Sequence, residues 1–396
     1  MSTLDIAIVG AGIGGLTAAL ALNAAGHAVT LIERRTGFSE VGAGLQLSPN
    51  ASRVLADLGL SAPLRRAATE PPGVTVRALE SGRRIGAVTL GPTARERYGA
   101  PYYVIHRADL QTLLLDALRA RPGIRLFVGR DVTGLSETAD AATLTVESVN
   151  GGKGETLRAD LVVGADGLRS RVRQHLDPRP LSACRMAAWR AVVPRESAPP
   201  DLQGDATGLW LGAGRHVVHY PILGGQRINV VAIVPERQGD EDWGRLGEPA
   251  VLRAHFRRVA PDLSELLAMP DSWLVWSLVE RPVSRPLARG RVALLGDAGH
   301  PVLPFLAQGA ALAIEDAAVL TRCLAAGDVP AALAAYADAR ASRARRVQKA
   351  ARGNGRAYHA RGLPAVIRNA VMRRLGPHGM RERYAWLYGW RPGPLG

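Results

Sequence analysis

The feature that most constrains how this chain folds is a glycine-rich turn near the amino terminus. It lies between a short apolar run over residues 6–9, typical of a strand, and an Ala- and Leu-rich segment over 16–25, typical of a helix. Gly10 permits a tight turn, Gly12 lets the backbone approach a pyrophosphate, and Gly15 lets the helix pack close to the sheet. The glycines of this turn are Gly10, Gly12, Gly14 and Gly15. The pattern predicts a strand–helix–strand unit that binds a dinucleotide.

The acidic residue that such a unit needs is also present. A second strand is predicted over 29–32, and it ends at Glu33, whose carboxylate can accept hydrogen bonds from both ribose hydroxyls. Arg34 follows directly and joins the predicted cofactor-binding residues. The unpaired N–H groups at the start of the helix suit the phosphates. A glycine-rich turn without a ligand would leave Glu33 unexplained, so we predict dinucleotide binding.

Composition excludes several other classes of protein. Of the 396 residues, 47% are hydrophobic and 21% are charged, which is the balance of a folded chain long enough for two or three domains. The formal net charge is +15, but the arginines are spread along the chain with a denser run only near its end, so we predict no nucleic-acid partner. Cys184 and Cys323 cannot form a disulfide framework or a paired-cysteine metal clip, which predicts no metal site and a cytoplasmic setting.

Neither of two long apolar stretches suits a membrane span. Residues 4–32 contain Asp5 and the glycines of the turn, and residues 302–320 contain Glu315 and Asp316. We therefore predict no integral membrane segment.

The rest of the chain alternates between two kinds of pattern. Short buried-type strands are predicted over 161–163 and 292–295, and helices over 309–324 and 331–351. Between about 184 and 234, β-type runs separated by Gly and Pro clusters predict a sheet that is mainly antiparallel.

Two further motifs make the pattern specific. An Asp-Gly pair at 166–167 follows the first of these strands, and a Gly-Asp pair at 296–297 follows the second, before a Gln-Gly pair at 308–309 opens a helix. Together with the glycine turn, they resemble the signature of the single-component FAD-dependent aromatic hydroxylases, the family that includes salicylate and para-hydroxybenzoate hydroxylases. The resemblance extends over residues 5–324.

The resemblance implies a fold and a division of the chain. It implies an α/β protein in which a Rossmann-like FAD-binding domain carries an inserted, mainly antiparallel β-sheet substrate domain and C-terminal helices. The FAD-binding domain is predicted from the discontinuous segments 1–72, 98–180 and 275–330, the substrate domain from 73–97 and 181–274, and the C-terminal helical region from 331–396.

The same resemblance assigns the cofactor, FAD, and the residues around it. It implies that Asp297 binds a ribityl hydroxyl, that the helix at Gly309 points its amino terminus at the flavin pyrimidine ring, and that Arg107 lies along the cofactor. Asp166 is assigned either to flavin and nicotinamide handling or to structure alone. Gly44 lies in the segment 42–46, which matches the family segment that borders the flavin, and a glycine loop that needs positive φ is a compatible interpretation. The predicted cofactor-binding residues are Gly10, Gly12, Gly14, Gly15, Glu33, Arg34, Gly44, Arg107, Asp166, Asp297, Gln308, Gly309 and Ala310.

The resemblance also implies the reaction. FAD is reduced by NADH or NADPH, reacts with O2 to a C4a-hydroperoxide, and transfers one oxygen atom to a small phenolic or acidic aromatic. No second G-x-G-x-x-G follows a strand in the sequence, which favours transient nicotinamide binding without a dedicated domain. The choice between NADH and NADPH, and between a monomer and a homodimer, stays open.

Hydroxylation is faster on a phenolate than on a phenol, so we expect a base at the substrate. A phenol with a pKa of ~10 is ionised to only about one part in a thousand at neutral pH, which corresponds to about 4 kcal/mol. His216 and His219 are the candidates, and because residues three apart on a strand point to opposite faces, at most one faces the substrate. Each has a plain alternative as a core or surface histidine. The family often has a histidine at about the position of His216 and the pair Tyr220-Pro221 after it.

Other substrate-side positions come from the resemblance as well. Arg190 is assigned either to a substrate carboxylate or to the sheet, Phe305, Leu306 and Gln308 lie where substrate and flavin meet, and His300 is assigned to structure. Some relatives that act on hydroxylated nicotinate or hydroxybenzoate have a histidine at about the position of Gln46, so Gln46 counts against those substrates. The catalytic candidates are His216, His219, Tyr220, Arg190 and Pro304.

Two other functions stay open on the sequence alone. One is epoxidation or reduction of a larger polycyclic or isoprenoid substrate by the same flavin, with the arginine-rich segment 352–383 as a lid or a membrane-touching element. The other is a non-catalytic flavoprotein that binds a partner through its basic tail.

Overall fold

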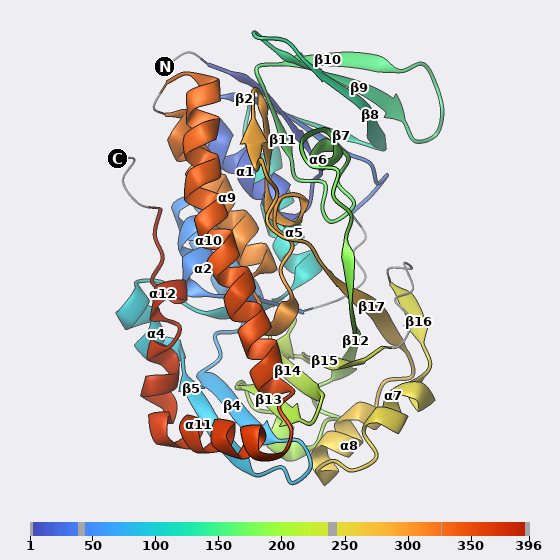
Figure 1. Cartoon of the computed structure of the whole chain (residues 1–396), viewed down its shortest axis with the longest axis vertical. Helices are drawn as coiled ribbons and strands as arrows, with labels where there is room; N and C mark the ends of the chain where they lie inside the picture. Colours follow the sequence, from blue (N-terminus) through green and yellow to red (C-terminus); the bar gives the residue numbers. More distant parts are fainter. Residues whose placement is uncertain (1–2, 39–43, 237–243, 326, 393–396) are drawn as a thin grey trace.

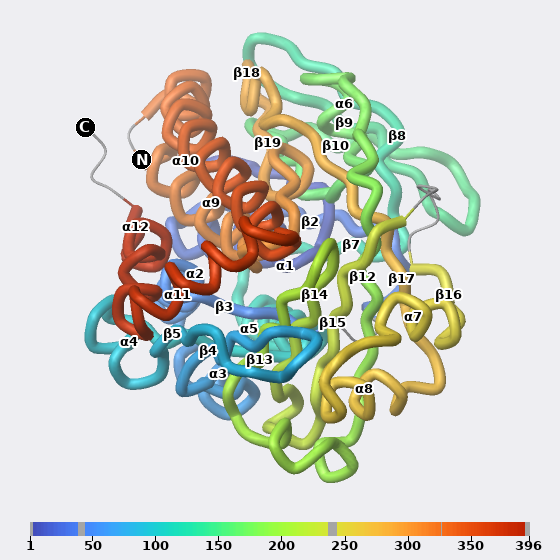
Figure 2. Tube along the Cα trace, turned by 60° about the horizontal axis from the view of Figure 1, so that its bottom comes forward, coloured from blue at the N-terminus to red at the C-terminus, as the bar shows by residue number. Residues whose placement is uncertain are grey.

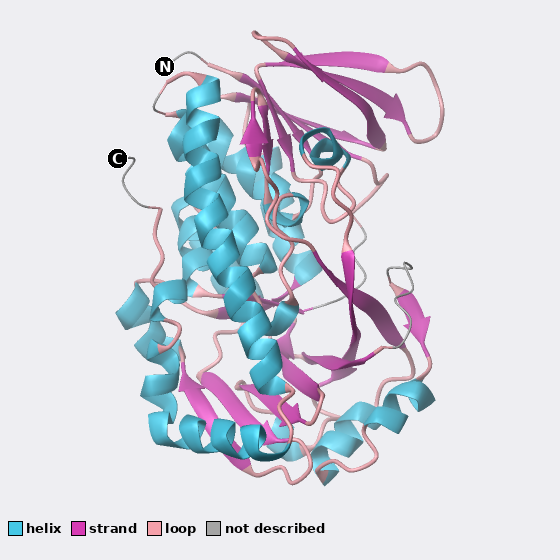
Figure 3. Cartoon of the chain, viewed as in Figure 1, coloured by secondary structure: helices cyan, strands magenta, loops and turns pink. Residues whose placement is uncertain are grey.

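The computed structural model describes residues 3–38, 44–236, 244–325 and 327–392. Two main sheets lie towards opposite ends of the molecule, and a long helix, α10 (Val329–Tyr358), runs along one side past both (Figure 1). Most of the helices gather on that side and most of the strands on the other (Figure 3). This arrangement confirms the predicted α/β architecture with a second sheet and C-terminal helices.

The amino-terminal strand lies at the centre of a six-stranded sheet. Its strands are β1 (Asp5–Val9), β2 (Ala28–Glu33), β7 (Ile124–Val128), β11 (Leu161–Gly164), β18 (Ala288–Arg289) and β19 (Val292–Leu294). The order is β18-β19-β11-β1-β2-β7, with every neighbouring pair parallel except β18 and β19. Strands that are buried on both faces read as continuous apolar runs, which is why the sequence predicted β11 and β19.

Different layers cover the two faces of this sheet (Figure 1). One face carries α1 (Ile13–Ala24), α2 (Pro49–Asp57), α5 (Arg107–Arg119) and α9 (Gly309–Leu324). The other face carries an antiparallel sheet of β8 (Arg130–Glu137), β9 (Ala142–Ser148) and β10 (Glu155–Ala159). Helix α1 packs against both α5 and α9, so the segment that follows the glycine turn is buried between helices far apart in the sequence.

The second main sheet has eight strands and is mainly antiparallel, as predicted. Its order is β16-β17-β12-β15-β14-β13-β4-β5, and the β13–β4 pair alone is parallel. The strands are β4 (Gly73–Ala78), β5 (Arg84–Thr89), β12 (Ser182–Pro194), β13 (Thr207–Gly212), β14 (Arg215–Ile222), β15 (Arg227–Pro235), β16 (Arg245–Gly247) and β17 (Trp273–Glu280). The predicted boundary at 274/275 therefore falls inside a strand, because β17 continues to Glu280 in this sheet before the chain returns to β18.

The two faces of the eight-stranded sheet have different neighbours. One face packs on α7 (Pro249–His255) and α8 (Pro261–Ala268) through a core that includes Trp189, Trp210 and Trp273. The opposite face turns towards the half of the molecule that holds the six-stranded sheet, which is the predicted flavin-binding half, and towards the carboxyl-terminal helices (Figure 2). Shorter elements complete the fold: α3 (Ser61–Ala67), α4 (Gly91–Tyr98), α6 (Arg171–Leu176), η1 (Pro200–Leu202), η2 (Gly296–Ala298), η3 (Pro304–Leu306), and a hairpin of β3 (Gly44–Leu47) with β6 (Tyr103–His106).

The carboxyl-terminal segment is helical and packs on the second sheet. Helix α10 is followed by α11 (Gly362–Glu382) and α12 (Ala385–Tyr388), and α11 lies along β5 with Met372 against Gly86. Among the described residues, no helix combines the length and the apolar character that a membrane crossing requires.

Candidate active site

The three sequence motifs meet at the carboxyl ends of neighbouring parallel strands, the edge where ligands of such sheets bind. The glycine turn follows β1, Asp166 follows β11 and Asp297 follows β19. A methyl group added at Gly10 would lie 2.5 Å from the carbonyl oxygen of Ala165, and one added at Gly14 would lie 2.9 Å from Cβ of Ala313 on α9. The turn, the Asp-Gly pair and helix α9 are therefore in direct contact.

The amino termini of two helices face open space at this edge. Gly12 is the N-cap of α1 and Gly309 opens α9, and an added Cβ at either position would meet no atom within 4 Å. Among the described residues no side chain caps either helix, and neither first turn contains an acidic residue. Free N–H groups and the positive end of the helix dipole favour anionic ligand groups at both places.

Glu33 lies beside the glycine turn, as its position in the sequence predicted. Its Oε2 accepts a hydrogen bond from the backbone N–H of Ala11 over 2.8 Å, and its Oε1 accepts one from Arg35 N over 2.8 Å. The carboxylate is thus held at the end of β2, beside the turn. Arg34, which precedes Arg35, is exposed.

Asp297 has the features of a ligand for hydroxyl groups. Its carboxylate makes no hydrogen bond to any residue that the structure describes, and burial raises its pKa despite the opposing charges of His300 and Arg107. Arg107 begins α5, and Gln111 on the same helix donates to the carbonyl oxygen of Ala11 in the glycine turn over 3.1 Å. Helix α5 therefore brings Arg107 to the same edge.

Asp166 has a structural role in this fold. Its Oδ2 accepts hydrogen bonds from the backbone N–H groups of Arg171 and Val172, which fixes the start of α6. Its Oδ1 is buried and has no hydrogen-bond partner among the described residues, and burial raises the pKa of this carboxyl. The residue can therefore hold α6 and still accept a bond from a ligand.

The side chain of Gln308 points away from the open edge. It is 1% exposed, donates from Nε2 to Oγ of Ser48 over 2.9 Å, and accepts at Oε1 from Asn50 over 3.1 Å. Gln308 therefore holds the loop before α9 against α2, and only its backbone is left for a cofactor. Its neighbours Gly309 and Ala310 form the first turn of α9 and are partly exposed.

A buried ion network lies behind this loop. Arg340 on α10 bonds Asp316 over 2.5 Å and Glu315 over 2.9 Å, and all three side chains are at most 1% exposed. His300 lies 2.7 Å from Oδ2 of Asp316, which also accepts from the backbone N–H of Gly296 over 2.8 Å. The network therefore fixes the turn that carries Asp297, and His300 belongs to it as expected for a structural residue.

The substrate-side candidates divide between the two faces of the eight-stranded sheet. His216 and Tyr220 lie on the face of β14 that turns towards the flavin half, where the ring of His216 is 5.7 Å from that of Phe305. His219 lies on the other face against Trp210 and Gly208, and burial and Arg77 lower its pKa to about 4. The structure therefore places His216 towards the flavin half and His219 in the core.

Arg190 lies on the same face as His216 and Tyr220. It is two strands away on β12, and its guanidinium stacks over Trp276 at 5.1 Å. The guanidinium makes no hydrogen bond to the described residues, and its Nε is buried. A cation held in this way suits an anionic ligand group.

The hairpin of β3 and β6 lies between the two halves of the molecule, with β6 in contact with β14 and β3 in contact with α9. Gly44 N donates to Oδ1 of Asn229 over 2.8 Å, and a methyl group at Gly44 would lie 2.5 Å from the ring of Tyr220. Gln46 on the same strand accepts from the hydroxyl of Tyr102 over 2.6 Å. Gly44 thus allows close approach, while Gly42 and Ala43, which belong to the same predicted segment, lie outside the described residues.

The loop that carries Pro304 forms one wall of the substrate side. Pro304 opens η3, and Phe305 packs against Gly355 of α10. Two residues that sequence reasoning missed complete this wall: the rings of Tyr358 and His359 lie 5.3 Å and 5.0 Å from that of His216. No motif marked them, because they belong to the end of an arginine-rich helix more than a hundred residues away.

The carboxyl-terminal segment is therefore part of this site, and its removal is expected to abolish turnover. A chain that ends at Arg352 loses Tyr358 and His359 from the wall and α11 from the surface of β5. We expect it to unfold at a lower urea concentration than the full chain and to show no substrate-stimulated oxidation of NADH or NADPH. Normal turnover of the shortened chain would place the segment outside the site.

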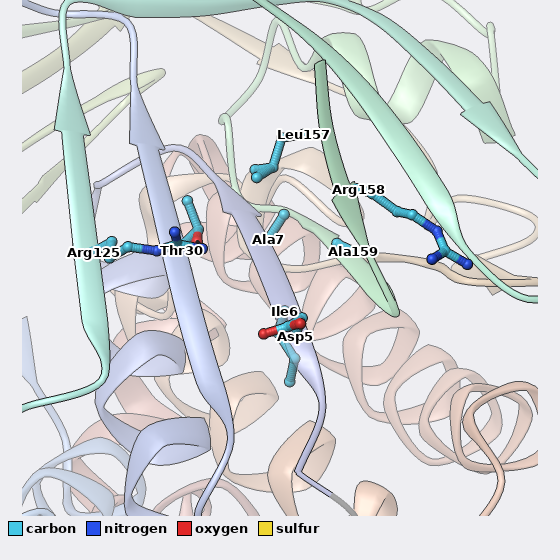
Figure 4. A pocket seen from close by; sticks show the side chains of 8 residues that line it. All are labelled: Asp5, Ile6, Ala7, Thr30, Arg125, Leu157, Arg158 and Ala159. Carbon is cyan, nitrogen blue, oxygen red and sulfur yellow. Dashed lines mark hydrogen bonds between the residues drawn. The ribbon is translucent and has the colours of Figure 1, made fainter. Parts of the chain in front are cut away.

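A small cavity lies away from this site. It has a volume of about 10 Å³ and opens at the amino-terminal end of β1 and β2, between Thr30, Arg125 and Ala159 (Figure 4). A space of that size holds at most a single water molecule. Among the described residues, no group of His, Cys, Asp and Glu side chains could hold a metal ion.

Comparison with known proteins agrees with this geometry. A family model described as an FAD binding domain matches residues 3–351. The chain is 35% identical to a 3-hydroxybenzoate 6-hydroxylase of Klebsiella oxytoca over 97% of this chain and 96% of that one. It is 36% identical to a 3-amino-4-hydroxybenzoate 2-monooxygenase of Streptomyces platensis over 99% and 97%. A solved salicylate hydroxylase substrate complex superimposes with a TM-score of 0.83 at 25% identity, over 99% of this chain and 97% of that one.

Proposed function

Because this chain belongs to the FAD binding domain family of flavoprotein aromatic hydroxylases, we propose that it hydroxylates a small aromatic acid that carries a phenolic hydroxyl group. The observation that carries the proposal is the shared face of His216, Tyr220 and Arg190. This face offers a base, a hydroxyl group and an unpartnered cation beside the edge where FAD is proposed to bind. The reductant is proposed to be NADH or NADPH, and the oxidant O2.

The residues at the strand edge fit FAD. Glu33 supplies an acceptor for ribose hydroxyls, Gly12 and the first turn of α1 supply space and N–H groups for the pyrophosphate, and Asp297 supplies an acceptor for a ribityl hydroxyl. The start of α9 at Gly309 favours negative charge on the isoalloxazine. When bound, FAD supplies the redox chemistry that activates O2 and delivers one oxygen atom.

The substrate residues bind and ionise the ring. Arg190 and His216 are separated by two strand spacings, about 10 Å, and by two residues along the strand, about 7 Å, so their side chains can reach opposite ends of a single ring. Arg190 then holds the carboxylate and His216 accepts the phenolic proton. Gln46 cannot take up a proton, which leaves this step to His216.

The walls suit a small ring rather than a polycyclic substrate. Phe305, Tyr358 and His359 enclose the ring of His216, and the 3% exposure of His216 shows how closely they pack. The aromatic rings of Phe305 and Tyr358 keep bulk water away from the reacting atoms. Two relatives named for hydroxylated benzoates support the same substrate class.

A substrate panel tests the proposal. FAD-loaded protein is mixed with NADH or NADPH, and oxygen uptake is followed with the isomeric monohydroxybenzoates, aminohydroxybenzoates, benzoate and phenol. We expect a compound that carries both the hydroxyl and the carboxylate to stimulate oxygen uptake and to yield a product with one added oxygen atom. If no aromatic stimulates NADH or NADPH oxidation, or if the product is reduced without gain of oxygen, the proposal is wrong.

Arg190 is expected to determine recognition of the carboxylate. Loss of a hydrogen bond to a charged group costs about 1.5–3 kcal/mol, so Arg190→Met should raise KM for the phenolic acid about 10- to 150-fold. KM for the matching phenol without a carboxylate should stay unchanged, which provides the control within the same variant. An equal loss for both compounds would show that Arg190 serves the sheet instead.

A further inference from the structure

His359 lies where it can connect the buried base to the surface. It caps the carboxyl end of α10, and its Nε2 is 2.8 Å from Nδ1 of His216. His216 is almost fully buried, whereas His359 is partly exposed. The pair therefore extends from the inside of the substrate site to its outside.

The backbone around His359 fixes this contact. Its N–H donates to the carbonyl oxygen of Gly355 over 3.1 Å, and its carbonyl oxygen accepts from Gly214 N, in the turn between β13 and β14, over 3.1 Å. Arg368 on α11 donates to the carbonyl oxygens of Ala357 and Tyr358, which ties the end of α10 to the next helix. Three separate elements thus fix the backbone at His359, from which its imidazole contacts His216 on β14.

The two imidazoles share one proton. Between two neutral rings at this distance, one nitrogen donates and the other accepts. If Nδ1 of His216 donates to Nε2 of His359, then Nε2 of His216 is the nitrogen left for substrate, and it makes no hydrogen bond to any described residue. This tautomer gives the base a free acceptor on its substrate side.

We infer that His359 completes a two-histidine relay that carries the phenolic proton of the substrate from His216 to solvent. The inference rests on the proposed function of this site. The substrate O–H bond breaks and an N–H bond forms at Nε2 of His216, while the electron pair stays on the phenolate oxygen. The proton on Nδ1 of His216 passes to Nε2 of His359, and the proton on Nδ1 of His359 leaves to water.

The surroundings favour passage of the proton over its retention. Burial, together with His359, lowers the pKa of His216, so this ring alone is a poor place to keep a proton. Burial and the charges of Arg361 and Arg368 lower the pKa of His359 to about 4. Tyr358 and Phe305 are the other side chains in ring contact with the pair, and neither has a carboxylate that would retain the proton there.

A His359→Gln variant distinguishes a proton relay from a simple hydrogen-bond partner. His359→Gln keeps a side chain able to bond Nδ1 of His216, but an amide cannot pass a proton on. His359→Ala removes both functions and leaves space for imidazole from solution. His378→Gln is the matched control, since His378 is an exposed histidine on the neighbouring α11.

The readout is the ionisation of a bound ligand, without reductant or turnover. A nitro-substituted hydroxybenzoate, whose phenolate absorbs in the visible, is mixed rapidly with FAD-loaded protein in weak buffer. We expect the wild type and His378→Gln to form phenolate at a rate independent of buffer concentration. His359→Gln should be at least ~10-fold slower, with a rate that rises with buffer, and added imidazole should restore the rate of His359→Ala.

Different failures have different signatures. Wild-type ionisation that is retained in His359→Gln, with no dependence on buffer, would overturn the relay and leave the proposed function intact. A slow His359→Ala beside a normal His359→Gln would also overturn it, because a positioning contact is then sufficient. Binding of the ligand to wild-type protein without phenolate formation would contradict the proposed role of His216 itself.

Discussion

A Gly15→Ala variant is expected to lose both FAD and stability. The added methyl group would overlap the carbonyl oxygen of Gly10, and that oxygen belongs to the backbone of the turn and cannot move aside. Forcing an extra carbon into a closed space costs about 1–3 kcal/mol and shifts the backbone. Because the turn that shifts is the one that approaches the pyrophosphate, the variant should be recovered without the visible absorption of bound flavin.

Gly12→Ala is expected to weaken FAD binding without changing the stability of the FAD-free protein. No atom lies within 4 Å of an added Cβ at Gly12, so the FAD-free variant should unfold at the same urea concentration as the FAD-free wild type. The methyl group would nevertheless occupy the space through which the pyrophosphate approaches, so the Kd for FAD should rise. Gly37→Ala, at another open position after β2, is the control for both measurements. Unchanged FAD affinity in Gly12→Ala would place the pyrophosphate elsewhere.

Arg340→Ala is expected to be the most destabilising substitution in the buried ion network. It leaves Glu315 and Asp316 with one charge partner fewer, and removal of one member of a buried ion pair costs about 3–5 kcal/mol. Because Asp316 also fixes the turn before Asp297, the affinity for FAD should fall as well. Arg345→Ala on the exposed side of the same helix should change the free energy of unfolding by less than about 0.5 kcal/mol.

The pH dependence of that difference provides a second check. Burial alone would raise the pKa of Asp316, but the charges of His300 and Arg340 lower it to about 2. The ionised Asp316 therefore stabilises the wild type fully above its unfolded pKa of about 4, and this contribution is lost as the pH falls towards 2. Without Arg340 the pKa of Asp316 rises, so the stability gap between the two proteins should narrow as the pH falls towards 2. A gap that widens in acid would contradict the assignment.

The flavin half of the site was predictable because its parts are local in the sequence. The glycine turn, Glu33 at the end of its strand and Asp297 after a buried strand each need only a few neighbouring residues, and parallel strands bring their carboxyl ends together. The direction in which Gln308 points was not predictable, since it depends on Ser48 and Asn50, which lie some 260 residues earlier in the chain.

The substrate half was predictable only in part. Strand periodicity separates His216 from His219, but it does not say which of the two faces the flavin half, because that depends on how the whole sheet packs. His359 has no sequence signal, since a histidine that follows an arginine-rich helix resembles any surface residue. Strand β17 extends past the predicted boundary to Glu280, because its apolar run continues there without a turn residue.

The most direct test of this account is the fate of molecular oxygen at the reconstituted protein. The chain is loaded with FAD and supplied with NADH or NADPH, isotopically labelled heavy O2 and a hydroxybenzoate that stimulates oxygen uptake. The mass of the product is then determined by mass spectrometry. We predict a dihydroxybenzoate that contains one atom of the heavy isotope, and we predict that a His216→Ala variant that still binds FAD does not form this product. A product without label, or a colourless protein that FAD cannot reconstitute, would contradict this prediction.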